Sequence, residues 1–233
     1  MPQIVVPNRV DGHPDLVDTD NPFPVRVEDP LAPGSVSIRK LLERNIDVAA
    51  WLTAEGQAFY ATDADQNDVV TGQTSFADTT PTFTLRIPAG TTAIPILVAL
   101  NQTGTVAGDA ISVIMEFAGV DRYASSGTSE LVRNSRIGMN SPINAQCTLY
   151  SGATLTATGA GTLPFGYRPW GVTVAQDVAP AEGISNELIW APSGPDFLEG
   201  PASVNIWTYA TTTGPTWFWT IKWVEFPTAR LGF

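Results

Sequence analysis

The hydrophobic and polar residues of this chain follow the period of a β-strand over most of its length. Thr82–Pro88 alternates strictly, and Ala93–Leu100 and Ala110–Phe117 are short, nearly continuous apolar runs. Runs of this length are too short for typical helices and fit strands buried between two sheets. The same reasoning predicts strands in six further segments: Glu130–Ile137, Gln146–Thr158, Gly171–Gln176, Glu187–Trp190, Val204–Ala210 and Thr216–Phe226.

Turn-forming residues separate these segments, as in Pro88–Gly90, Gln102–Gly104 and Gly159–Gly161. About nine short strands divided by such turns predict an all-β fold, a β-sandwich or jelly roll. No internal segment has the composition of a linker. We therefore expect residues 35–233 to form a single β-sandwich domain.

One short helix is predicted near residues 36–45. Ser35 or Ser37 can cap its start, and the apolar residues Ile38 and Leu41 recur at helical spacing. The helix would precede the first strands of the sandwich.

Residues 1–34 have a different character. They hold seven prolines and six acidic residues against two arginines, Arg9 and Arg26. Proline at this density prevents helix and interior strand. The sequence therefore predicts an extended, acidic N-terminal arm that docks on its own domain or on a neighbouring subunit.

Charge and composition exclude several classes of protein. With 12 basic and 23 acidic residues, the net charge is −11, and such a chain repels phosphate backbones. We expect no direct contact with nucleic acid. The longest apolar run is far too short to span a membrane, and no basic, apolar leader opens the chain. The single cysteine, Cys147, cannot form an internal disulfide, which favours folding in a reducing cytosol.

Candidate catalytic groups are few. The only histidine, His13, lies beside Pro14 in the arm, where no rigid cleft would hold a triad. Cys147 lies on an alternating segment and is expected to be a buried, unreactive thiol. Because the chain also lacks paired Cys/His spacings, a phosphate loop and a dinucleotide fingerprint, we expect no cofactor and no enzyme activity.

One segment resembles the opening of a calcium loop. Asp63, Asp65 and Asn67 alternate so that three oxygen ligands can face one cation. The EF-hand pattern fails at Asp68, where glycine is needed, and at Thr74, where glutamate belongs. We interpret the segment as a solvated acidic loop and keep these three residues as the candidate metal ligands.

The strongest local feature is the last predicted strand. Strand alternation puts Trp217, Trp219 and Trp223 on one face, with Lys222 on the other. Three large aromatics in a row fit a core, a subunit interface or a flat platform for sugars. We place core or interface ahead of the platform, and we include Trp207 of the neighbouring segment in this candidate set.

A family resemblance rests on Pro81–Thr92 leading into Ile94–Leu100, which is similar to the strands of β-sandwich structural proteins of viruses and phages. The general plan is similar too, with an arm, one helix, Thr/Gly/Pro-rich strands and a Trp-rich final strand before Leu231–Phe233. The resemblance implies a virion structural protein, either a capsid, head-decoration, minor capsid or tail-associated subunit, made in the host cytoplasm. Its partners would be other copies of itself, with a trimer as one possible homo-oligomer, and other virion proteins. Arms that contact a genome are usually basic, so this acidic arm is not expected to package one.

Two other functions stay open. The first is a carbohydrate-binding, lectin-like module that uses aromatic faces and the acidic loop. The second is a jelly-roll glycoside hydrolase, because Asn186–Trp190 resembles the nucleophile strand of certain endoglucanases, with Glu116 or Glu225 as partner acid.

Overall fold

The computed structural model describes residues 5–6, 15–16, 47–63, 69–103, 110–138, 143–158, 166–175 and 186–231. The chain divides into two compact units, Met1–Val36 and Ser37–Phe233. In the first unit, β1 (Val5–Val6) pairs antiparallel with β2 (Asp15–Leu16). The rest of the predicted arm, and the helix predicted near 36–45, lie outside the described residues.

The second unit is an all-β sandwich, as the alternating pattern predicted. The strands of its first sheet are β3 (Ala58–Thr62), β4 (Val70–Thr71), β6 (Thr91–Gln102), β10 (Val132–Asn134), β14 (Glu187–Trp190), β15 (Leu198–Glu199) and β17 (Thr216–Pro227). Their order is β10-β3-β17-β6-β14, with β15 beside β6 and β4 beside β17. Every pairing in the sheet is antiparallel.

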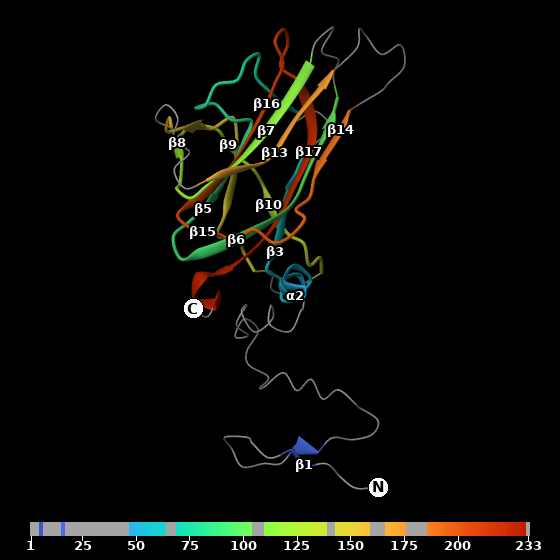
Figure 1. Ribbon diagram of the computed structural model, residues 1–233, viewed down its shortest axis with the longest axis vertical. Coiled ribbons are helices and arrows are strands. Elements are labelled where there is room, and N and C mark those ends of the chain that lie inside the picture. The colour runs from blue at the N-terminus through green and yellow to red at the C-terminus, as the bar shows by residue number, and fades with distance from the viewer. Residues whose placement is uncertain are drawn as a thin grey trace. The chain divides into compact units, whose positions relative to one another are not determined.

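The strands of the second sheet are β5 (Phe83–Ile87), β7 (Ala110–Ala118), β9 (Thr128–Ser129), β11 (Thr148–Ser151), β13 (Tyr167–Ala175) and β16 (Ala202–Tyr209). Their order is β13-β7-β16-β5-β11-β9. Figure 1 labels most of the strands of both sheets. A separate ribbon pairs β8 (Tyr123–Ser125) with β12 (Thr154–Leu155). Each of the nine predicted segments overlaps at least one of these strands, although strands such as β6 and β13 begin before the predicted bounds.

The strand order is that of a jelly roll. If the eight long-range strands β3, β5, β6, β7, β13, β14, β16 and β17 are lettered B to I, the two sheets read B-I-D-G and C-H-E-F. The last strand, β17, therefore lies between the first, β3, and β6. This position puts the tryptophan-rich strand in the middle of the first sheet.

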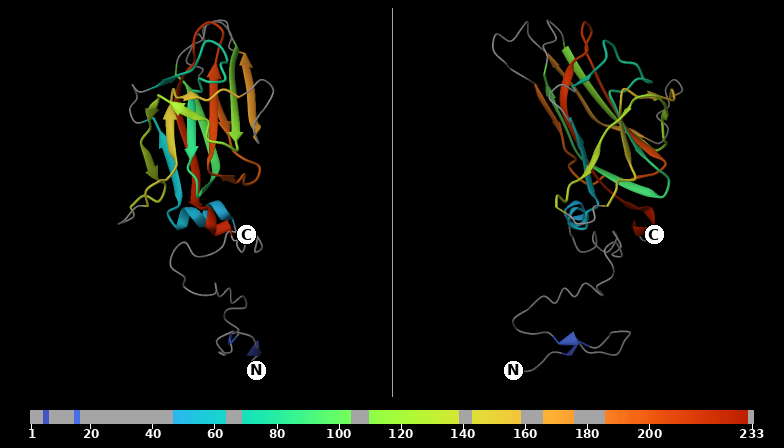
Figure 2. Two further views of the ribbon diagram at one scale, coloured as in Figure 1. Left: turned by 90° about the vertical axis from the view of Figure 1, so that its left-hand side faces the viewer. Right: turned by 180° about the vertical axis from the view of Figure 1, so that it is seen from behind.

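A long insertion between β7 and β13 crosses the sandwich. It carries β8 to β12, and it adds β10 beside β3 in the first sheet and β11 beside β5 in the second. One lateral edge of the sandwich is thus covered by the insertion, while β13 and β14 form the opposite edge (Figure 2).

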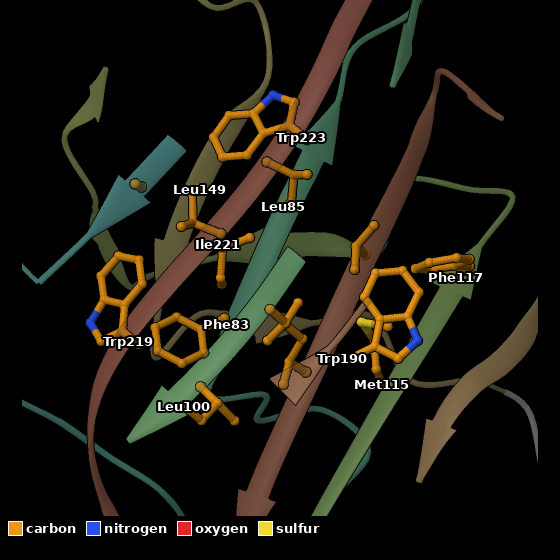
Figure 3. Close-up of a cluster of buried hydrophobic side chains, with 14 of the residues drawn as sticks. Phe83, Leu85, Leu100, Met115, Phe117, Leu149, Trp190, Trp219, Ile221 and Trp223 are labelled. Atoms are coloured by element: carbon orange, nitrogen blue, oxygen red, sulfur yellow. The ribbon is translucent and has the colours of Figure 1, made fainter. Parts of the chain in front are cut away.

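The core lies between the two sheets. Trp219, Ile221 and Trp223 of β17 face Phe83 and Leu85 of β5, as Figure 3 shows. Along the first half of β17, buried and less buried residues alternate, as expected for a strand with one face in a core.

A second buried layer lies outside the first sheet. Val224 is paired with Ala58 on one side and Ile94 on the other, and all three are at most 1% exposed. The helix α2 (Val48–Ala54) packs against β17 and β3 and contributes the buried Leu52. This layer explains why the outward side of β17 is apolar near its end.

Local capping fixes the limits of α2. The Asp47 carboxylate accepts hydrogen bonds from the Ala49 and Ala50 amides, at 2.9 and 3.1 Å. Gly56, with φ 80°, ends the helix, since this left-handed conformation suits glycine. Neither α2 nor the terminal 3₁₀ helix η1 (Thr228–Leu231), the helices of the described chain, is long and apolar enough to cross a membrane.

Candidate functional site

The candidate tryptophans of β17 lie between the two sheets. Trp217, Trp219 and Trp223 are at most 2% exposed. The Trp219 ring lies 4.8 Å from that of Phe83 in the opposite sheet, and Trp223 stacks on Phe59 of the neighbouring strand. In this fold their faces are covered by other side chains, so they offer no platform on which a sugar can stack.

Hydrogen bonds hold two of these indoles in place. Trp217 Nε1 donates to the Thr208 hydroxyl of the opposite sheet at 3.0 Å, and Trp223 Nε1 donates to Glu225 at 2.8 Å. The third indole, Trp219 Nε1, has no hydrogen-bond partner among the described residues. The Trp219 ring is therefore held by packing alone.

Trp207 has a different environment. Its neighbours along β16, Val204 and Ile206, point into the core, whereas Trp207 lies on the outer side of the second sheet. It is 2% exposed because the loop between β4 and β5 covers it, and its Nε1 donates to the Ala77 carbonyl of that loop at 3.0 Å. The ring of Phe76 in that loop lies 5.7 Å away and is itself 39% exposed.

A buried ion pair lies on the same outer side of the second sheet. Glu116 of β7 and Arg122, at the start of the insertion, approach to 2.5 Å, and each side chain is 2% exposed. Asn205 of β16 donates a second hydrogen bond to the Glu116 carboxylate at 3.2 Å. The guanidinium of Arg122 also lies over the Trp207 ring, 5.8 Å from its centre. These contacts hold the insertion onto the sheet.

Arg122 also joins the insertion to the loop that contains Asp78. It donates to the Asp78 carboxylate at 2.8 Å and to the Thr156 carbonyl at 3.1 Å. The backbone amide and the hydroxyl of Thr158 donate to the same carboxylate, each at 2.9 Å. Partial burial alone would raise the pKa of Asp78, but the Thr158 and Arg122 hydrogen bonds outweigh it and lower the pKa.

Glu225 is a second buried carboxylate. It lies on β17 at 2% exposure and accepts hydrogen bonds from the amides of Gln146 and Cys147, just before β11, and from the Trp223 indole. It therefore attaches the start of β11 to the first sheet. Burial, together with the charge and hydrogen bonding of Glu225, raises the pKa of the free Cys147 thiol, which makes that thiol a poor nucleophile.

The three glutamates proposed for glycoside hydrolysis do not converge. Glu116 lies on the outer side of the second sheet, and Glu225 lies with Trp223 between the sheets. Glu187 is exposed at the start of β14, while its neighbour Leu188 packs against the core. Two catalytic carboxylates must face one bond across about 5–10 Å, and these residues sit on different layers of the sandwich.

The metal and histidine candidates are mostly outside the described chain. Asp65, Asn67 and His13 lie there, and only Asp63 is described, at the end of β3, where its amide donates to the Trp219 carbonyl. Within the described ranges, no group of three or more His, Cys, Asp or Glu residues is placed to hold a metal ion.

A cavity of about 440 Å³ opens beside β10. Phe59, Val132 and Cys147 form part of its wall, and Glu130 and Asn134 are polar groups of its lining. The Asn134 amide already donates to the carbonyls of Gly56 and Ile143, and Glu130 accepts from the Ser151 hydroxyl. These polar groups are engaged in holding the insertion.

Comparison with protein-family models, curated proteins and solved structures gives no significant match. Sequence reasoning singled out the tryptophans, but it missed the network around Arg122, because Asp78, Thr156 and Asn205 lie far from Arg122 in the chain and no motif links them.

Proposed function

We propose that this protein is a structural subunit of a virion that acts by self-assembly. The observation that carries the proposal is the jelly-roll sandwich whose buried charged groups hold loops in place. Glu116, Arg122 and Glu225 all serve this purpose. Such an arrangement favours a rigid building block over a catalyst, since a catalyst needs polar groups directed into an open cleft.

The N-terminal arm supplies the proposed means of assembly. Because Val5–Val6 pairs with Asp15–Leu16, residues 5–16 add little reach; the 18 residues from 17 to 34, at about 3.3–3.6 Å each, reach on the order of 60 Å when extended. A compact chain of this length has a radius of gyration of roughly 17–18 Å. The arm is thus long enough to reach a neighbouring subunit, and its prolines reduce the entropy lost when it becomes ordered there. Its acidic character favours protein partners over nucleic acid.

The test compares the full chain with a variant lacking residues 1–34. We expect the deletion to leave the far-UV and near-UV circular dichroism of the sandwich unchanged, because its strands begin at Ala58. We expect assembly to weaken, as measured by size-exclusion chromatography with light scattering and by electron microscopy.

A matched control replaces residues 1–34 by a shuffled sequence of the same length and composition. The shuffled arm keeps the charge and bulk but loses any specific docking. Equal assembly by the full chain, the deletion and the shuffled variant would show that the arm is not the assembly device.

Carbohydrate binding is the second candidate. Its support is a small aromatic patch in which exposed Phe76 lies 5.8 Å from Tyr209 and 5.7 Å from Trp207. A glycan array separates the two functions. Binding that is lost in Phe76→Ala, while the melting temperature stays unchanged, would favour the lectin-like role.

A further inference from the structure

Strand β13 forms a free edge of the second sheet. It pairs with β7 on one side and with none of the described strands on the other. Figure 2 shows it at the margin of the sheet, on the side opposite to the insertion. The outer backbone N–H and C=O groups of β13 thus have no ladder partner among the described strands, which is the arrangement that accepts a further strand.

The other edge strands are short and carry charges or polar residues. β14 has four residues and includes exposed Glu187, β10 has three and includes exposed Arg133, and β9 has two. β13 has nine residues, and its Trp170–Ala175 portion has neither charge nor proline. Edge strands usually avoid this composition, because it invites pairing with another chain.

The core is incompletely covered at this edge. Trp170 and Val172 of β13 and Leu188 of β14 are only partly buried against it. Gly171, between the first two, points to the outer side of the sheet, where it has open space.

The proposed self-assembly makes a second copy of this chain the occupant, and the charge of β13 permits it. Each copy carries a net charge of −11, so two copies repel over most of their surfaces. Tyr167–Ala175 contains one basic residue, Arg168, and no acid. Two β13 edges can therefore approach without opposing carboxylates on the strands that meet.

We propose that β13 pairs antiparallel with β13 of a second copy about a two-fold axis, which joins the two second sheets into one. This inference names a contact for the proposed self-assembly, and its biological role rests on that proposal. The pairing itself is tested on the purified protein alone. A strand of nine residues is about 30 Å long, so a single strand pair makes a small interface. We therefore expect a dimer that depends on protein concentration rather than an obligate one.

The alternation of β13 restricts the register. Residues opposed in an antiparallel pair point to the same side of the sheet, so a core-facing residue must oppose a core-facing residue. In a symmetric pair, one residue then opposes its own copy at the axis. Pro169 and the bulge between Tyr167 and Trp170 make the start of β13 irregular, which leaves Gly171, Val172 and Thr173 as the axial candidates.

The first test is Thr173→Lys against Thr128→Lys. Both threonines are exposed strand residues of the same sheet, but Thr128 lies at the opposite edge, in β9. Sedimentation velocity over a concentration series should show dimers for the wild type and Thr128→Lys. Thr173→Lys should dissociate about tenfold or more easily, because in each of the three registers it puts a lysine of both copies within two residues of the axis. Circular dichroism checks that all three proteins fold alike.

The second test places single cysteines at Gly171, Val172 and Thr173. Paired Cα atoms in an antiparallel ladder lie about 4.5–5.5 Å apart, within the range of a disulfide. Mild oxidation should cross-link the variant whose cysteine lies at the axis. The wild type, whose Cys147 is buried, and Thr128→Cys should stay uncross-linked.

The outcomes separate the two proposals. No cross-link at any of the three positions, or equal dissociation of Thr173→Lys and Thr128→Lys, overturns the β13 pairing. If the arm deletion still abolishes assembly in that case, the proposed function stands. Loss of the dimer in Thr173→Lys, with no effect of the arm deletion, supports the pairing and contradicts the role of the arm.

Discussion

Removal of the Arg122 side chain should destabilise the protein far more than removal of another arginine from the same face. In Arg122→Met, Glu116 keeps the Asn205 hydrogen bond at 3.2 Å and loses its counter-charge, although it is only 1% exposed. Breaking a buried ion pair by removing one partner costs about 3–5 kcal/mol, because a buried charge is left uncompensated. At about 2–4 °C per kcal/mol for a chain of this size, the melting temperature should fall by roughly 6–20 °C.

Arg86→Met is the matched control. Arg86 pairs with Asp121 of the same insertion at 2.6 Å, but its side chain is 37% exposed, so solvent screens the pair. Its loss should cost about 1 kcal/mol or less. The double variant Glu116→Gln/Arg122→Met, which removes both charges, should recover part of the stability lost in Arg122→Met.

Two measurements check the reasoning. Chemical denaturation gives the free energies of unfolding, and hydrogen exchange reports where the structure opens first. In Arg122→Met, the amides of Leu155, Thr156 and Thr158, which bond to the Asp78 loop and to the Arg122 carbonyl, should exchange before those of β17. Equal, small losses in Arg122→Met and Arg86→Met would refute the view that a buried pair attaches the insertion.

Two further predictions concern the core and acid stability. Trp219→Ala should lower the free energy of unfolding, measured by urea denaturation, by about 3–5 kcal/mol. Trp219→Phe should lower it less than Trp223→Phe, because the latter also loses the indole hydrogen bond to Glu225. A Trp219→Ala protein as stable as the wild type would count against the packed core. Asp78 has a pKa below its ordinary value of 3.8, so its stabilisation is complete above that pH and is lost as pH falls through the lower, folded value. The difference in melting temperature between wild type and Asp78→Asn should therefore be constant near pH 7 and shrink below about pH 4; a difference that does not change with pH would contradict it.

The sequence predicted those parts of the fold that depend on local periodicity. The alternation of β17 indicated which face carries the tryptophans, and each predicted segment overlaps a strand. The pattern did not single out β3, whose Ala58–Thr62 is short and has three alanine or threonine residues among its five. It also gave no reason why Val224 should be buried on the outward side, since α2 covers that side only in the folded chain.

The charged contacts were beyond sequence reasoning for a different reason. Asp78, Glu116 and Arg122 meet because the insertion returns over the second sheet, a path that no local pattern encodes. Glu116 and Glu225 appeared in the sequence as candidate acids of a hydrolase. The fold instead gives each a buried partner, on a different layer of the sandwich. Residue type alone could not separate these roles.

The insertion also determines which edge of the sandwich is free. It leaves from β7, adds β10 and β11 at one side, and returns to β13 at the other. If both lateral edges of the sandwich accepted a further strand, copies would add head to tail and form fibres, because each added copy exposes a new edge strand. In the proposed pairing, the two β13 strands are both consumed, so assembly through this edge closes at two copies. By holding the insertion at the other edge, the buried contacts of Arg122 and Glu225 would limit assembly through β13 to a closed pair, and larger assemblies would require another contact, for which the N-terminal arm is the proposed device.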